Sequence, residues 1–388
     1  MRVNTWGKND IIYHILIDRF AGYKSKDRWD EPIFLGGNIK GIINKLPYLN
    51  ELGVTTIWIS PFYKTSAYHG YHITDFYEVD PHFGTKKDIH LLIKKTHELN
   101  MKIIADFVPN HCSKSHPYFI DAQKNKTSPY RKWFYFTDWP NTYQCFLSIT
   151  DLPKLCLEEQ SVSDHIIEAA LYWLSFGFDG YRLDHVIGPS NHFWNKFVKR
   201  IKKQYPDTIL IGEAWMQGIR FHELKTVKMN GKIWKWLRGN SSDTLLKTYT
   251  NILDGVLDFH IQQLIKDYIC NKESSKISLM KNIHKHYGKY SSSDLLPTFL
   301  DNHDMDRFLF TCSNDISKLK KAARLQFSLD QPAIIYYGTE IGMGQKDSIW
   351  SRKSHGDILA REPMCWDKPN QDILDFYKEV IQEKRFSK

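Results

Sequence analysis

The stretch that decides the fold is Gly177-Phe178-Asp179-Gly180-Tyr181-Arg182-Leu183-Asp184-His185-Val186. Its first half has the composition of a loop that turns into a strand, and Arg182 and Asp184 follow with one residue between them. Residues i and i+2 of a strand point to the same face, so we expect a guanidinium beside a carboxylate at the end of a strand. The arginine favours the ionised carboxylate and lowers its pKa. Taken alone, such a pair is more often a structural ion pair than part of an active site.

The overall composition is that of an ordinary globular protein. The chain has 388 residues, of which 42% are hydrophobic and 25% are charged, so it can bury a large core. The 53 basic and 44 acidic residues give a net charge of +9 without a long block of like charge. No nucleic-acid-binding motif accompanies this charge, and no window approaches ~20 apolar residues. We therefore predict neither a nucleic-acid partner nor a membrane partner.

The N-terminal segment and the cysteines bear on the cellular compartment. The first ten residues contain Arg2, Lys8 and Asp10 and lack the apolar core of a signal peptide, so we expect a cytoplasmic protein. None of the six cysteines shows C-x-x-C spacing, which favours buried free thiols over disulfides or a zinc site. These cysteines are Cys112, Cys145, Cys156, Cys270, Cys312 and Cys365.

Short apolar runs alternate with amphipathic stretches along the chain. Most runs are almost continuously apolar, as expected for strands that are covered on both faces. Eight such strands alternating with helices predict a parallel (β/α)8 TIM barrel. The predicted strands are residues 11–17, 55–60, 102–108, 180–183, 208–211, 255–259, 298–300 and 333–337. The clearest helical spacings fall at residues 89–99, 163–176, 193–201, 319–329 and 373–384.

One gap between predicted strands is too long for an ordinary loop. Residues 110–161 are rich in aromatic residues, proline and asparagine. We predict that they form an inserted subdomain after strand 3, and that residues 1–109 and 162–388 form the barrel. A loop of this length on a rigid scaffold usually carries function. Because the last predicted helix ends close to the end of the sequence, we expect no C-terminal β-domain.

Polar clusters follow four of the predicted strands. In a barrel of this kind the reacting residues lie at the C-terminal ends of the strands. Helix caps and turns also place Asp and Asn after strands, but four such clusters on one rim are improbable as structural residues alone. The clusters are Asp106-Phe107-Val108-Pro109-Asn110-His111, Arg182-Leu183-Asp184-His185, Gly212-Glu213-Ala214-Trp215 and Asp301-Asn302-His303-Asp304.

In this order the four clusters resemble the short signature regions of the α-amylase family of glycoside hydrolases. The similarity covers nearly the whole chain, from residue 11 to the last predicted helix. It implies a (β/α)8 barrel with an inserted subdomain and an α-amylase-type glycosidase activity. Further matching pieces are Ala67-Tyr68-His69-Gly70-Tyr71, Asp80-Pro81-His82-Phe83-Gly84-Thr85 and Tyr336-Tyr337-Gly338-Thr339-Glu340-Ile341-Gly342-Met343.

The resemblance implies the catalytic roles. Asp184 matches the nucleophile, Glu213 the general acid/base, and Asp304 a third carboxylate that grips the hydroxyl groups of the sugar ring. Members of the family retain the anomeric configuration through a covalent glycosyl-enzyme, which needs two carboxyl groups ~5–5.5 Å apart. Arg182 would keep Asp184 ionised, and the crowding of carboxylates would raise the pKa of Glu213. Asp106 would orient the region around Arg182.

The resemblance also implies residues that bind the substrate. His111 and His303 match residues that hydrogen-bond the sugar at the cleavage point, and Tyr71 matches an aromatic residue that stacks on that ring. Trp215 either faces the sugar or belongs to the core. The remaining implied substrate-binding residues are His69, Arg182, Asp357 and Arg361, with a surface ion pair as the alternative for the last two.

One segment of the predicted insertion narrows the subgroup. Leu152-Pro153-Lys154-Leu155-Cys156 resembles the M-P-K-L-N segment of neopullulanases and cyclomaltodextrinases, with Leu in place of Met and Cys in place of Asn. The leading expectation is cleavage of α-1,4 bonds in starch- or glycogen-like glucans or maltooligosaccharides. The alternatives are a cyclomaltodextrinase or neopullulanase, an α-glucosidase with transglycosylation, and a non-catalytic carbohydrate-binding or assembly subunit. The last alternative predicts the loss of a catalytic carboxylate, whereas this chain keeps all three.

The resemblance raises the question of a calcium ion. Many α-amylases hold a structural calcium with an Asn that matches Asn110 and a His four residues after the nucleophile, where this chain has Gly188. Hard cations need several oxygen ligands, and the sequence does not assemble them. We therefore predict that no metal ion or other cofactor is required.

Overall fold

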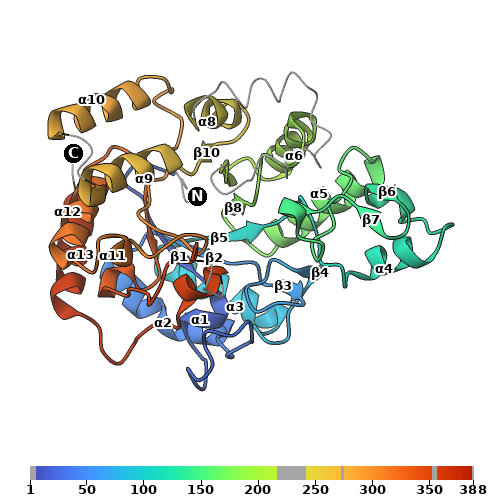
Figure 1. Cartoon of the computed structure of the whole chain (residues 1–388), viewed down its shortest axis with the longest axis horizontal. Coiled ribbons are helices and arrows are strands. Elements are labelled where there is room, and N and C mark those ends of the chain that lie inside the picture. The colour runs from blue at the N-terminus through green and yellow to red at the C-terminus, as the bar shows by residue number, and fades with distance from the viewer. Residues whose placement is uncertain (1–5, 216–241, 272–274, 352–355, 387–388) are drawn as a thin grey trace. The chain divides into compact units, whose positions relative to one another are not determined.

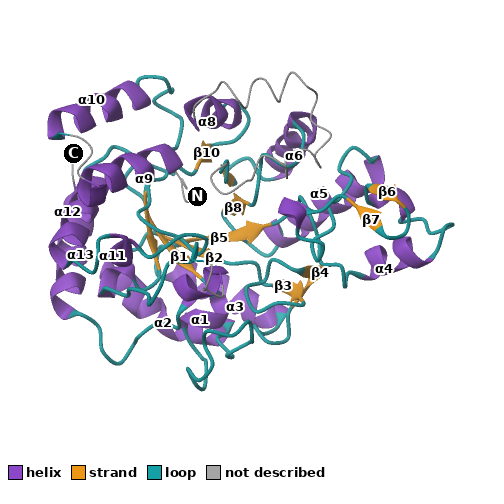
Figure 2. Ribbon diagram, in the orientation of Figure 1, coloured by secondary structure: helices purple, strands orange, loops and turns teal. Residues whose placement is uncertain are grey.

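The computed structural model describes residues 6–215, 242–271, 275–351 and 356–386. Within these ranges, seven strands form one sheet in the order β10-β9-β8-β5-β2-β1-β11, and these strands are orange in Figure 2. The strand pairs β1–β2, β1–β11, β8–β9 and β9–β10 are parallel. The strands are β1 (Ile11–Ile15), β2 (Thr56–Ile59), β5 (Lys102–Phe107), β8 (Gly180–Leu183), β9 (Ile209–Gly212), β10 (Gly255–Val256) and β11 (Ala333–Tyr336).

Burial explains why these strands are continuous apolar runs in the sequence. Every residue of β1, β2, β8, β9 and β11 is buried. Strands of a parallel sheet are covered on both faces, so neither face needs polar side chains. The described part of the chain therefore has the parallel α/β architecture that the sequence predicts.

Two compact units divide the chain and alternate along the sequence. Unit 1 consists of Met1–Ser60, His82–Ile104 and Leu257–Lys388, and unit 2 consists of Pro61–Pro81 and Ala105–Val256. The division that the sequence suggests, with an inserted subdomain over residues 110–161, stays a prediction.

Unit 1 contains β1, β2 and β11, with Ile12 opposite Thr56 and Ile11 opposite Ala333. Helix α12 (Ile316–Phe327) packs along α13 (Gln371–Phe386), both in the orange to red part of Figure 1. The other α-helices of this unit are α1 (Ile17–Phe20), α2 (Ile39–Leu52), α3 (Lys86–Glu98), α9 (Phe259–Lys266), α10 (Lys276–Tyr287) and α11 (Phe308–Thr311).

Helix boundaries in unit 1 follow local capping chemistry. Thr85 and Asp88 form a reciprocal capping box at the start of α3. The side chain of Asn38 accepts a hydrogen bond from Gly41 N at the start of α2. Helix α2 ends at Gly53, whose φ of 96° lies in the left-handed region that favours glycine.

Unit 2 contains β8, β9 and β10 and the antiparallel pair β3 (Tyr63–Thr65) and β4 (Ile73–Val79). Gly180 opens β8 opposite Ile209, and a Cβ atom at this position would come 2.2 Å from the Ile209 carbonyl oxygen, so only glycine fits. The α-helices of this unit are α4 (Pro117–Lys124), α5 (Gln160–Leu174), α6 (Asn191–Gln204) and α8 (Ser242–Thr250).

The long excursion after β5, which is the segment of residues 110–161 predicted as an insertion, has secondary structure of its own. It contains α4 and the short antiparallel pair β6 (Phe136–Asp138) and β7 (Thr142–Tyr143). Isolated antiparallel bridges join His111 to Lys154 and Phe134 to Leu155. The first of these bridges brings the end of the excursion back beside its beginning.

The seventh predicted strand, residues 298–300, is wrong as a strand. In the described structure this segment forms only an isolated parallel bridge between Thr298 and Ala333. Proline residues 297 and 332 precede the two bridge residues, and proline has no N–H to extend a ladder of hydrogen bonds. Thr298 N instead donates to the carbonyl oxygen of Pro332.

Two further findings concern the sequence-based expectations on membranes and cysteines. No helix among the described residues is long and apolar enough to cross a membrane. All six cysteines are free thiols, and the sulfur atoms of Cys270 and Cys312 lie 3.3 Å apart.

Candidate active site

A buried arginine, Arg182 of β8, binds three carboxyl groups in unit 2. Its Nη1 donates to Asp106 Oδ1 at 2.9 Å and to Asp184 Oδ1 at 2.8 Å. Its Nη2 forms an ion pair with Glu213 Oε1. Burial alone would lower the pKa of Arg182, but Asp106 and then Glu213 raise the pKa well above its usual value. The guanidinium is therefore a permanent positive charge among three acids.

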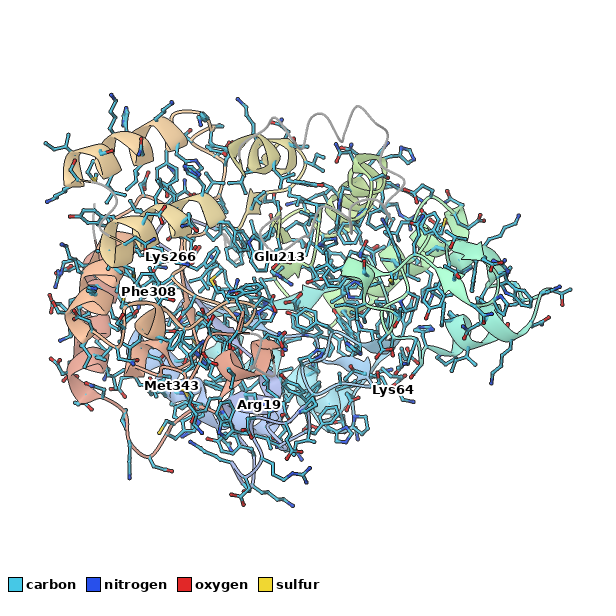
Figure 3. All side chains as sticks on the ribbon, viewed as in Figure 1. Arg19, Lys64, Glu213, Lys266, Phe308 and Met343 are labelled. Carbon is cyan, nitrogen blue, oxygen red and sulfur yellow. The ribbon has the colours of Figure 1, made fainter. Side chains whose placement is uncertain are left out.

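The parallel sheet places these acids at neighbouring strand ends. Asp184 follows β8, and its N–H donates to the carbonyl oxygen of Phe107 in β5 at 2.9 Å. Glu213 follows β9, and its N–H donates to the carbonyl oxygen of Leu183 in β8 at 2.9 Å. Glu213 is labelled in Figure 3. Because the strands are parallel and adjacent, their carboxyl ends present the acidic residues on one rim.

Tyr71 and His69 come from the loop between β3 and β4. The Tyr71 hydroxyl donates to Asp106 Oδ2 at 2.7 Å, and Tyr71 N donates to His69 Nδ1 at 3.2 Å. Gly70 lies between them with a φ of 88°. Asp106 thus receives hydrogen bonds from both Arg182 and Tyr71, which favours its ionised form.

The histidines that follow β5 and β8 both contact the ring of Phe146. Phe146 stacks on His111 with ring centroids 4.6 Å apart and meets the edge of His185 at 4.7 Å. Burial lowers the pKa of His111 well below its usual value, and the charges of His185 and His72 lower it further. Burial, and next the charge of Lys154, lowers the pKa of His185 to about 3. Both rings are therefore neutral hydrogen-bonding groups near neutral pH.

The turn after Asp184 contacts Glu213 directly. His185 N donates to Glu213 Oε2 at 3.2 Å, and Val186 N donates to the carbonyl oxygen of Glu213 at 3.1 Å. Trp215, two residues after Glu213, is half-buried and ends the described range. A role for Trp215 in facing the sugar stays a prediction.

A second group of predicted residues lies in unit 1. Arg361 Nε donates to the carbonyl oxygen of His303 at 2.8 Å, and its Nη2 donates to Asp304 Oδ1 at 2.9 Å. The same Nη2 forms an ion pair with Asp357. His303 Nε2 lies 3.0 Å from the other oxygen of Asp304. Arg361 therefore does more than pair with Asp357, because it also orients the Asp304 carboxylate.

Sequence reasoning missed two ring systems beside His303. His14 of β1 stacks on Trp58 of β2 with ring centroids 3.6 Å apart, and it meets His303 edge-on at 5.0 Å. His14 is completely buried. The signal was present, since polar His14 interrupts an apolar strand just as polar residues stand at the ends of the other strands.

The predicted residues thus fall into two groups, each described within its own unit. The group in unit 2 comprises Tyr71, His69, Arg182, Asp184 and Glu213, with His111 close to the turn after Asp184. The group in unit 1 comprises His303, Asp304, Asp357 and Arg361. Their catalytic and substrate-binding roles stay predictions.

The residues at the family's calcium position do not fit a divalent cation. Gly188 lies against Asn110, since a Cβ atom at Gly188 would come 2.2 Å from Asn110 Oδ1. The Gly188 carbonyl oxygen, a possible ligand, already accepts a hydrogen bond of 2.9 Å from Lys154 Nζ. A lysine ammonium repels a second cation, and calcium needs six to eight oxygen ligands. No group of three or more His, Cys, Asp or Glu residues in the described part of the chain could hold a metal ion.

The comparisons with known proteins all point to the same protein family. The family model "Alpha amylase, catalytic domain" matches residues 14–373. "Alpha-amylase 2" of Dictyoglomus thermophilum is 36% identical over 385 residues, which are 98% of this chain and 64% of that protein. "Intracellular maltogenic amylase" of Bacillus subtilis is 30% identical and covers 97% of this chain and 61% of its own length. A "Cyclomaltodextrinase" of a Bacillus species is 30% identical, with 97% and 66% covered. The chain thus spans less than two thirds of the length of these relatives.

Solved structures agree with the sequence comparisons. The α-amylase of Geobacillus thermoleovorans in complex with acarbose is 30% identical, has a TM-score of 0.79, and covers 98% of this chain and 80% of its own. A structure described as "Cyclomaltodextrinase" is 28% identical with a TM-score of 0.83, covering 98% and 64%. These matches show the TIM-barrel fold, and together with the family model they show that the chain belongs to the α-amylase catalytic-domain family.

Proposed function

We propose that the chain is a retaining glycoside hydrolase that cleaves α-1,4-glucosidic bonds in maltooligosaccharides and in starch- or glycogen-like glucans. The observation that carries the proposal is the contact of one buried guanidinium, that of Arg182, with both Asp184 and Glu213. The two acids follow neighbouring parallel strands, which lie ~4.8 Å apart. Their shared contact with one guanidinium brings the two carboxyl groups close together, and a retaining mechanism needs carboxyl groups ~5–5.5 Å apart.

Asp184 is the proposed nucleophile. A carboxylate oxygen of Asp184 attacks the anomeric carbon while the bond to the leaving oxygen breaks and Glu213 donates its proton to that oxygen. Glu213 then takes a proton from water, whose oxygen attacks the anomeric carbon and releases Asp184. Each of the two steps inverts the configuration at the anomeric carbon, so the two steps together retain it. The Arg182 Nη1 contact with Asp184 Oδ1 favours the ionised form that the first attack requires.

The charge balance around Arg182 supports the presence of an acid as well as a base. One positive charge faces three carboxyl groups in a buried space, so three ionised carboxylates would leave an excess of two negative charges. Repulsion among them favours keeping a proton on one group. Glu213 matches the family's general acid and is the proposed proton carrier.

Asp304 is the proposed third carboxylate. Both of its oxygens are oriented, one by Arg361 Nη2 and the other by His303 Nε2. Its side chain is 29% exposed, so it can still reach a sugar hydroxyl. Tyr71, His69, His111 and Trp215 are proposed to bind the sugar, as the family resemblance implies.

A cyclodextrin- or pullulan-cleaving activity is the second candidate. Residues 152–156 resemble the M-P-K-L-N segment of such enzymes, and relatives carry the names cyclomaltodextrinase and neopullulanase. A cytoplasmic location is proposed on the name of the intracellular maltogenic amylase. The proposed partner is a glucan or a maltooligosaccharide.

The stereochemical test is to follow nascent products by proton NMR. Purified protein acting on a maltooligosaccharide should first release the α-anomer at the new reducing end, with mutarotation following later. Initial release of the β-anomer would contradict the retaining mechanism. Initial rates on starch, β-cyclodextrin and pullulan then separate the two candidates, because faster cleavage of cyclodextrin favours the second.

A further inference from the structure

We propose that Lys154 is a positioning residue for the acid/base Glu213, acting through the turn His185–Gly188. The inference rests on the proposed role of Glu213 and concerns a lysine to which the family roles above give no function. It also explains why calcium does not fit here, because the Lys154 ammonium already binds the Gly188 carbonyl oxygen that a cation would use as a ligand.

The backbone of Lys154 is held on both sides. Leu155 N donates to the carbonyl oxygen of Asn110 at 3.0 Å, and Cys112 N donates to that of Pro153 at 3.2 Å. Lys154 N itself donates to the carbonyl oxygen of Gln144 at 2.9 Å. These bonds fix the point from which the long side chain extends.

The ammonium group ends on the turn that follows the proposed nucleophile. Lys154 Nζ donates to the Gly188 carbonyl oxygen at 2.9 Å, a charge-assisted bond in a half-buried place. Burial lowers the pKa of Lys154, while Glu158 and Cys156 act in the opposite direction. The charge also helps to keep the neighbouring His185 ring neutral, second to burial.

The turn connects this bond to Glu213. Gly188 N donates to the His185 carbonyl oxygen at 2.9 Å, which closes the turn, and His185 has the unfavourable φ of 46°. The same residue donates its N–H to Glu213 Oε2 at 3.2 Å. Lys154 thus stabilises the strained turn at Gly188, and at the other end of the turn His185 N positions the carboxyl group of Glu213. Without the ammonium, the turn can relax and the N–H can leave Glu213.

The discriminating experiment compares two substrates that differ in their need for acid catalysis. A natural maltooligosaccharide has a poor leaving group, a sugar hydroxyl oxygen that needs a proton. In an activated chloronitrophenyl maltotrioside the leaving group is a chloronitrophenolate, which departs with little protonation. For K154M we expect kcat on the maltooligosaccharide to fall about tenfold or more and kcat on the activated glycoside to fall less than about threefold. KM should change little on either substrate. K154R, which keeps the charge and a donor, should restore most of the natural activity.

Matched variants make the result decisive. K114M removes an exposed lysine of the same segment, whose ammonium pairs with Asp151 at the surface, and should leave both rates unchanged. E213Q should show the same selective loss as K154M, but larger. If K154M does not fold by circular dichroism, K154Q is measured in its place with the same expected selectivity. Equal losses on the two substrates, or no loss, would overturn the role of Lys154. A lack of leaving-group selectivity in E213Q would instead overturn the proposed role of Glu213.

Discussion

At the residue scale, the site in unit 2 is organised by Arg182. Its guanidinium contacts Asp106, Asp184 and Glu213, which come from three different strands. Only arginine presents several N–H donors in a fixed planar fork, so one side chain can order three carboxyl groups at once. The positions of the proposed nucleophile and the proposed acid are therefore coupled through this single residue.

The variant R182K tests this coupling. Lysine keeps the charge but is a point donor, so it cannot hold all three acids. We expect kcat/KM to fall by at least about a hundredfold and the free energy of unfolding to fall by about 3 kcal/mol, as for a broken buried ion pair. Steady-state kinetics and urea unfolding measure the two effects.

The control for R182K is R200K. Arg200 is a half-exposed arginine that pairs with Asp164 and Glu168, so its replacement should change stability by less than about 0.5 kcal/mol. An R182K protein with near-normal activity would contradict the organising role of the guanidinium.

Parts of the site could be read from the sequence because their geometry is local. Arg182 and Asp184 are two residues apart in a strand, so the alternation of side chains predicts their contact. The bond between Arg361 and Asp304 joins residues that are 57 apart in the sequence. No periodicity links such positions, and the same holds for Lys154 and Gly188. Their contacts depend on tertiary packing.

At the element scale, the strands were predictable wherever hydrophobic runs decide pairing. The run at residues 298–300 is equally apolar, yet it forms only a bridge, because the prolines beside the bridge remove N–H donors. Helix α3 begins at Lys86, directly after the capping-box residue Thr85 and three residues before Ile89, the first apolar residue of the periodic stretch. Caps and prolines therefore determine where helices and strands begin and end, which hydrophobic periodicity alone does not determine.

Helix α4 has a cap that is sensitive to acid. His116 is buried, and its Nδ1 accepts a hydrogen bond from Tyr118 N at 3.2 Å. Burial, and next the charge of His165, lowers the pKa of His116 to about 4. Because its folded pKa lies below the usual value of 6.5, the stability that neutral His116 contributes is complete above pH 6.5 and is lost as pH falls toward 4.

H116N should remove this dependence, since asparagine is a good cap that does not titrate. Urea midpoints measured at about pH 7 and about pH 5 should fall less with acid in H116N than in the unmodified protein. H192N, at an exposed histidine of α6, serves as the control and should leave the difference between the two midpoints unchanged. An identical acid effect in H116N and the unmodified protein would show that His116 is not the sensitive group.

At the scale of the whole molecule, the order of the strands was predictable from the alternation of strands and helices. The two compact units were not, because each gathers segments that are far apart in the sequence. The excursion after β5 illustrates the same limit. Its composition predicts an insertion, whereas the bridges between its beginning and its end depend on pairings across more than forty residues, such as His111 with Lys154.

Metal removal is a test on the whole protein. Since Lys154 holds the Gly188 carbonyl oxygen, we expect a chelator to leave both the thermal midpoint and the activity unchanged. Differential scanning calorimetry and an initial-rate assay, each with and without EDTA, measure this. A loss of stability or activity that added calcium restores would contradict the proposal that no metal is required.

The measurement that most directly tests the central claim is to trap the glycosyl-enzyme. E213Q, incubated with an activated fluorosugar maltosyl fluoride, should accumulate a covalent adduct because the second step lacks its base. Mass spectrometry of peptides should place the sugar on Asp184, and the double variant D184N/E213Q should remain unlabelled. A sugar attached to another residue, or equal labelling of the double variant, would contradict Asp184 as the nucleophile.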